Sequence, residues 1–77
     1  MNELLVKYKH VNDSSERGCI LSNIYNGRVA DLIPIVKQVD SIQLEENWYK
    51  YVSCEFIPSS DIGILDVLYI YVEGYDK

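Results

Sequence analysis

The sequence predicts an α+β domain in which a small antiparallel sheet of four to five strands packs on one or two helices. The chain has 77 residues, 48% of them hydrophobic and 25% charged, which is an ordinary composition for one globular domain spanning residues 1–77. Several segments alternate apolar and polar residues, as half-buried strands do. A sheet with an apolar face needs a second layer, and only residues 14–38 are suited to supply it as a helix. The alternative is an all-β meander curled into a small barrel.

The first strand is predicted over Glu3 to His10. One of its faces carries Leu4, Val6, Tyr8 and His10, and the other carries Leu5, Lys7 and Lys9. The polar run that begins at Asn12 ends the strand.

Residues 14–38 fit three alternatives. In the first, a capping box formed by Asp13 and Glu16 begins a helix over Ser14 to Asn26, and Gly27 ends it. In the second, Asn26-Gly27 is the two-residue turn of a hairpin. In the third, a helix starts near Gly27 and Pro34 is its defect. The apolar stripe of that helix is Val29, Leu32, Ile33 and Val36. We expect at least one helix between Ser14 and Gln38.

The C-terminal half predicts three antiparallel strands, over about Val39 to Leu44, Trp48 to Ile57 and Gly63 to Glu73. A three-residue turn at Glu45 to Asn47 and a five-residue loop at Pro58 to Ile62 connect them. The core face of this sheet is then Ile42, Leu44, Trp48, Val52, Cys54, Phe56, Ile64, Leu68, Ile70 and Val72.

The opposite face collects tyrosines. The same register places Tyr49 opposite Tyr71 and Tyr51 opposite Tyr69. Such a face fits three roles: a layer packed under a helix, a protein-binding surface, or a platform that stacks the bases of single-stranded nucleic acid.

Acidic residues accompany the tyrosines. The net charge is −5, and residues 38–77 carry eight acids against two bases. These acids either keep a small sheet protein soluble or form an acidic surface for a partner that is basic. The candidate partner-binding residues are Tyr49, Tyr51, Tyr69, Tyr71, Glu45, Glu46, Glu55 and Glu73.

No pattern of catalytic residues is visible, so we expect a protein that is not an enzyme. His10 is the only histidine, and the loop serines have no nucleophile context. Cys19 and Cys54 are expected to be buried, reduced thiols, with one disulfide as the alternative. No cofactor or metal is expected. The N-terminus has no signal-peptide pattern and no apolar run is long enough for a membrane span, so we expect a cytoplasmic protein that binds no membrane.

These observations favour a small acidic binding protein. In its profile (short, acidic, tyrosine-rich and without motifs) the chain is similar to small phage inhibitors of host enzymes or defence systems and to small immunity or antitoxin proteins. That similarity implies stoichiometric inhibition of a nucleic-acid-handling or defence enzyme, and it assigns no residue roles. Single-stranded nucleic-acid or nucleotide binding is the first alternative, and a structural or assembly subunit is the second. The sequence leaves a homodimer open.

Duplex DNA is an unexpected ligand, because binding to its phosphates relies on clustered lysine and arginine. We predict no binding tighter than micromolar at about 150 mM salt, a range where nonspecific binding is weak. Fluorescence anisotropy with a labelled duplex measures this, and a submicromolar dissociation constant would contradict the inference from charge.

Overall fold

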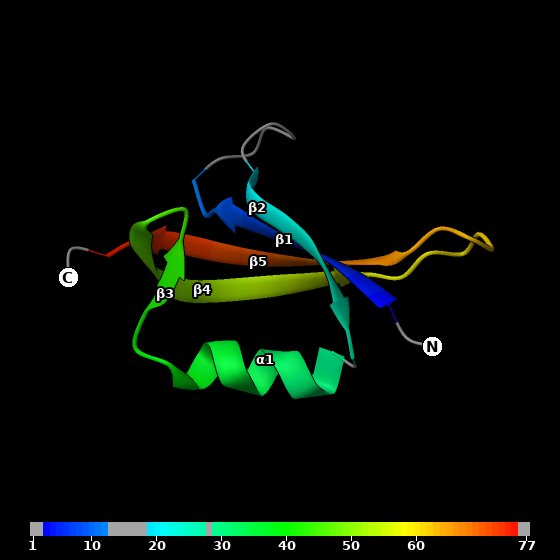
Figure 1. Ribbon diagram of the computed structural model, residues 1–77, viewed down its shortest axis with the longest axis horizontal. Coiled ribbons are helices and arrows are strands. Elements are labelled where there is room, and N and C mark those ends of the chain that lie inside the picture. Colours follow the sequence, from blue (N-terminus) through cyan, green and yellow to red (C-terminus); the bar gives the residue numbers. More distant parts are fainter. Residues whose placement is uncertain (1–2, 13–18, 28, 76–77) are drawn as a thin grey trace.

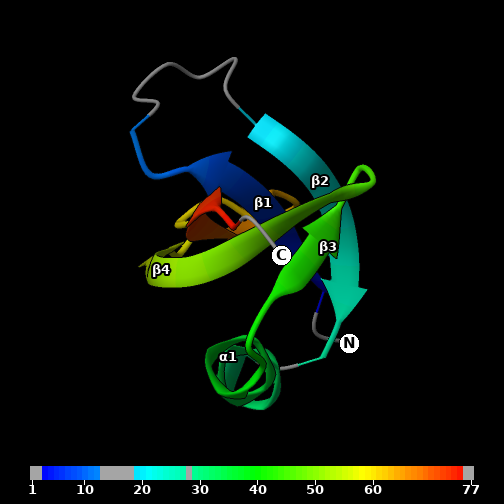
Figure 2. The same ribbon diagram turned by 90° about the vertical axis from the view of Figure 1, so that its left-hand side faces the viewer.

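Five strands and one helix make up the part of the chain that the computed structural model describes, residues 3–12, 19–27 and 29–75. In chain order they are β1 (Glu3–His10), β2 (Cys19–Asn26), α1 (Val29–Gln38), β3 (Ile42–Leu44), β4 (Asn47–Ile57) and β5 (Asp66–Gly74). The strands form one sheet that curls into a half-barrel, and α1 packs against one of its faces (Figures 1 and 2). No helix in the described ranges has the length and apolar character to cross a membrane.

The sheet is mixed, where the sequence predicted an antiparallel one. Its strand order is β2-β1-β5-β4-β3, and β1 runs parallel to β5. The other three pairs, β1–β2, β3–β4 and β4–β5, are antiparallel. The first and last strands of the chain therefore lie together at the centre of the sheet. Local periodicity does not reveal such a pairing, because it joins segments from opposite ends of the sequence.

The core is small and lies between the centre of the sheet and α1. Its buried apolar side chains are Leu4, Val6, Val36, Leu44, Leu68, Ile70 and Val72. Three of them come from β5 and are fully inaccessible to solvent. Because a chain of this length buries only about 60% of the surface that its unfolded form exposes, each of these side chains carries a large share of the stability.

The third alternative for residues 14–38 is confirmed by α1. Val36 is buried, and Leu32 and Ile33 pack against the core, as the apolar stripe predicted. Pro34 lies inside the helix on its exposed side. The first two alternatives are wrong over Cys19 to Asn26, which is strand β2; its pairing with β1 satisfies the backbone and overrides the local helical pattern. Asp13 and Glu16, the predicted capping box, lie outside the described residues.

The turn between β3 and β4 has two residues, where the sequence predicted three. Leu44 pairs with Asn47, so Glu45 and Glu46 alone form the turn. Their φ angles are 51° and 72°, which identifies a type I′ turn. This turn type matches the twist of a hairpin but normally uses Asn-Gly, so two glutamates occupy a backbone conformation that L-residues disfavour.

A β-bulge in β4 changes the face on which part of that strand presents its side chains. The register with β5 shifts between Tyr51 and Ser53, which leaves Val52 as the extra residue. Cys54 and Phe56 stay on the core side, opposite Ile70 and Leu68. The predicted core positions Trp48, Val52 and Ile64 are wrong, because all three are exposed.

We predict that Glu46→Gly stabilises the fold. A left-handed conformation costs an L-residue roughly 1–2 kcal/mol, and glycine returns part of that through its freedom in the unfolded chain. The free energy of unfolding should rise by about 0.5–1 kcal/mol in urea denaturation. Glu46→Ala is the control, since it removes the same charge but keeps the β-carbon. Equal stabilisation by both variants would assign the effect to charge instead of backbone conformation.

Candidate functional site

The structure separates the four tyrosines that the sequence placed on one face. Tyr69 and Tyr71 lie on the face of the sheet that points away from α1, since they alternate with the buried Leu68 and Ile70. Tyr51 pairs with the buried Val72, and Tyr49 with Gly74, so both lie on the side of the core. The prediction of a single tyrosine face is wrong because the register with β5 differs from the predicted one and shifts again at Val52.

Lys7, Lys9, Glu55, Tyr69 and Tyr71 gather on three adjacent strands, and we call them the open face. The parallel register sets Lys7 beside Tyr69 and Lys9 beside Tyr71. On the other side of β5, Glu55 lies opposite Tyr69. None of the described helices or strands covers this side of the sheet, because α1 packs on the other side (Figure 1). The alternative that the tyrosines pack under a helix is therefore wrong for Tyr69 and Tyr71.

The two tyrosine rings of the open face are held in a fixed arrangement. Their centroids are 6.2 Å apart and their planes differ by 20°, a stacked geometry. The Tyr71 hydroxyl donates a hydrogen bond of 2.8 Å to Oε1 of Glu55. That hydrogen bond, together with partial burial, raises the pKa of Tyr71 above its usual value. Tyr71 therefore stays protonated at neutral pH and keeps its ring anchored across the strands.

Two lysines complete the open face. The Nζ atoms of Lys7 and Lys9 lie 6.0 Å and 5.5 Å from the centroid of Tyr69, within reach of a cation–π attraction. Lys9 is only 8% exposed, which an ammonium tolerates when its stem lies along apolar surface and its head meets a π face. The sequence did place Lys7 and Lys9 on one face of the first strand. It did not show that this face continues across Tyr69, because the two strands are far apart in the chain.

An apolar extension continues the open face toward the hairpin that joins β4 to β5. Ile57 lies opposite Val67, on the same side as Tyr69, and is 47% exposed. Ile62 and Ile64, in the loop between the two strands, are 105% and 60% exposed. The loop itself is braced where Asp66 Oδ1 accepts a hydrogen bond of 2.7 Å from the Ser59 N–H. The hairpin thus projects beyond the rest of the sheet (Figure 1) with isoleucines facing solvent.

The remaining predicted acids lie away from the tyrosine pair. Glu45 and Glu46 form the exposed β3–β4 turn, and Glu73 lies opposite Lys50 near the same end of the sheet. Of the four predicted glutamates, Glu55 is the one that the structure brings into contact with a tyrosine.

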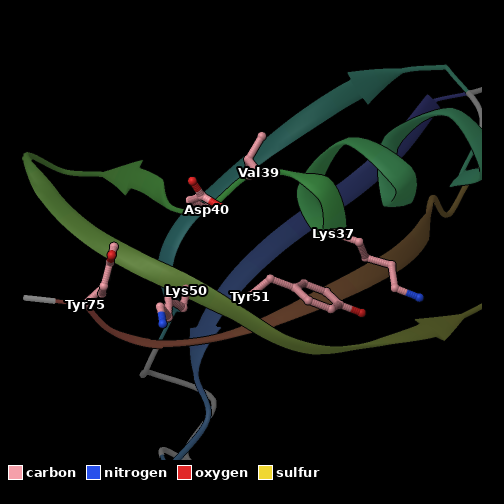
Figure 3. Close-up of a pocket in the computed structure, with 6 residues that line it drawn as sticks. All are labelled: Lys37, Val39, Asp40, Lys50, Tyr51 and Tyr75. Atoms are coloured by element: carbon pink, nitrogen blue, oxygen red, sulfur yellow. The ribbon is translucent and has the colours of Figure 1, made fainter. Parts of the chain in front are cut away.

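A hollow of about 270 Å³ lies at the C-terminal end of α1 (Figure 3). It is lined by Lys37, Val39, Asp40, Lys50, Tyr51 and Tyr75. Lys37 and Lys50 extend toward opposite sides of it in Figure 3, so their ammonium groups do not converge on one ligand atom. Lys50 Nζ instead lies 4.6 Å from the ring centroid of Tyr75. The hollow is slightly smaller than most ligand pockets, which range over about 300–1,000 Å³.

Tyr51 reaches this hollow because of the bulge that follows it. A hydrogen bond with Cys54, reinforced by partial burial, raises the pKa of Tyr51 to about 12. Cys54 and Cys19 are free thiols, each half-buried instead of fully buried as the sequence predicted.

The described residues offer little for catalysis. No three histidine, cysteine, aspartate or glutamate side chains among them are grouped as metal ligands would be. Comparison of the chain with models of known protein families, with curated proteins and with solved structures finds no match. The candidate function therefore depends on the geometry of the open face.

We predict three late-titrating tyrosines. Burial raises the pKa of Tyr8, and the partners named above raise those of Tyr51 and Tyr71. A folded-state pKa above the unfolded value of 10.0 stabilises the protonated form. The contribution of Tyr51 is therefore complete below pH 10 and disappears as the pH rises toward about 12.

Tyrosinate absorbance during an alkaline titration measures this. Cys54→Ala should move the titration of Tyr51 to lower pH, since the hydrogen bond with Cys54 is the largest cause of its shift. Tyr51→Phe identifies which transition belongs to that residue. An unchanged titration curve in Cys54→Ala would show that the thiol does not perturb Tyr51.

Proposed function

We propose that the protein is a stoichiometric protein-binding protein and that the open face is its contact surface. The observation that carries the proposal is the stacked pair of Tyr69 and Tyr71, half-buried on a sheet face that none of the described elements covers. Tyrosine is enriched among the residues that dominate binding energy at interfaces.

Rigidity of the open face supports the proposal. The hydrogen bond from Tyr71 to Glu55 and the two lysine contacts with Tyr69 hold the aromatic rings before any partner arrives. Side chains that are already ordered lose less conformational entropy on binding. A surface built in this way gains more net affinity from each ring than a mobile one does.

The size of the surface is adequate for a specific complex. A standard interface covers about 800 Å² on each partner, roughly a seventh of the 5484 Å² that this protein exposes. The open face supplies an aromatic centre, and Ile57, Ile62 and Ile64 extend it with apolar area along the hairpin. Acidic groups lie toward both ends, at the 45–46 turn and at Asp61. An apolar centre with a polar rim is the usual anatomy of protein interfaces.

The net charge of −5 supports a partner with a basic surface. We extend the proposal to a nucleic-acid-handling or defence enzyme in the cytoplasm, whose basic cleft this protein occupies as an inhibitor. Such a complex excludes nucleic acid from the cleft and has a fixed stoichiometry.

Single-stranded nucleic-acid binding is the second candidate, and one observation favours it. Lys7 and Lys9 flank Tyr69, which gives the stacking rings the positive charges that base-stacking surfaces normally have. Protein binding ranks first because the chain as a whole is acidic and because both ammonium groups already interact with a ring.

We predict that Tyr69→Ala removes partner binding while most of the stability remains. A central interface tyrosine contributes about 2 kcal/mol or more to binding, which corresponds to roughly a thirtyfold loss of affinity. A cross-strand pair contributes only about 0.2–1 kcal/mol to the sheet. Affinity capture from host lysate with the wild type and the variant, together with melting temperatures, measures both effects.

Tyr51→Ala is the matched control, because it removes the same atoms from the other side of the sheet. It should retain the captured partner. Leu68→Ala calibrates core damage, with an expected destabilisation of about 2–5 kcal/mol. Loss of the partner in Tyr51→Ala but not in Tyr69→Ala would exclude the open face. Tight, Tyr69-dependent binding of a single-stranded oligonucleotide at physiological salt would reverse the order of the two candidates.

A further inference from the structure

The two edges of the sheet differ in how they are protected against pairing with another strand. At one edge, β3 has three residues, and the part of β4 beyond it contains the bulge at Val52 and the charged Lys50 and Glu55. Short edge strands, bulges and charged side chains are the devices that keep sheet edges from pairing. This edge has all three.

Strand β2 forms the other edge and has few of these devices. Its eight residues, Cys19–Asn26, include no proline and no lysine, arginine, aspartate or glutamate. The register with β1 shifts once, near Ile20, so Leu21 to Asn26 is a regular strand. Ser22, Asn23 and Ile24 are exposed. Figure 2 shows β2 at the margin of the half-barrel, and no other described strand pairs with its outer side.

We propose that β2 pairs with β2 of a second copy of this chain to form an antiparallel homodimer. Charge selects this occupant. Two copies that each carry −5 repel one another, and β2 is a surface on which they meet without bringing like charges together. An antiparallel pair of identical strands is also its own complement under a twofold axis, so the contact closes after two copies.

The dimer has a definite geometry. A twofold axis perpendicular to the sheet joins the two sheets edge to edge, with both open faces on the same side. Five strand spacings then separate β5 from its counterpart, about 24 Å at roughly 4.8 Å each. Under the proposed function, which this consequence alone rests on, the dimer presents two tyrosine pairs to a partner.

Analytical ultracentrifugation over micromolar to millimolar protein tests the proposal with two matched variants. Ile24→Lys places a charge in the middle of β2, where both copies would meet, and should raise the dimer dissociation constant by about tenfold or more. Ile57→Lys makes the same substitution at an isoleucine of similar exposure on β4 and should leave the dimer intact. Circular dichroism checks that both variants fold.

Hydrogen exchange of the wild type gives an independent readout. In the dimer, alternate amides between Leu21 and Asn26 gain protection as protein concentration rises, and the amides of β4 do not. This holds even if Ile24→Lys fails to fold. A wild type that stays monomeric throughout, a dimer that Ile24→Lys does not weaken, or β2 protection that is independent of concentration would overturn the proposal. Tyr69→Ala should dimerise normally, so failure of the proposed function and failure of the dimer are distinguishable.

Discussion

The parallel pairing of β1 with β5 is the constraint on which the rest of the structure depends. It places Val6 beside Leu68 and Tyr8 beside Ile70, which builds the centre of the core against α1. On the reverse side, the same pairing sets Lys7 and Lys9 next to Tyr69 and Tyr71. One backbone ladder thus creates both the buried face that stabilises the protein and the exposed face proposed to bind. Neither face exists until the first and last strands meet.

Sequence patterns predicted what local chemistry determines. The alternation of Leu4, Val6 and Tyr8 gives β1 its observed bounds, and the stripe through Leu32, Ile33 and Val36 identifies α1. The patterns failed where partners are distant or backbone geometry is unusual. No alternation shows which strand lies beside β1, and a glutamate pair gives no sign of a two-residue turn with positive φ. The bulge at Val52 has no compositional signal either.

That bulge has the largest effect on the candidate site. It divides four tyrosines between two environments: Tyr69 and Tyr71 on the open face, Tyr49 and Tyr51 on the side of the core. The sequence supplied the right kind of residue and half of the right set. It missed the lysines, which change the electrostatic character of the aromatic pair from acidic and bare to locally basic. An acidic chain can therefore present a surface whose local charge differs from its total.

The arrangement of β1 and β5 also determines how the protein resists mechanical force. Their parallel register, from Leu4 beside Asp66 to His10 beside Val72, puts the start of β1 and the end of β5 at opposite ends of the sheet (Figure 1). A pull applied at those two points slides one strand along the other, so the hydrogen bonds between them share the load and must break together. A chain pulled in this direction, as by a protease that threads its substrates, therefore resists through shear, whereas peeling β2 from its edge opens one bond at a time.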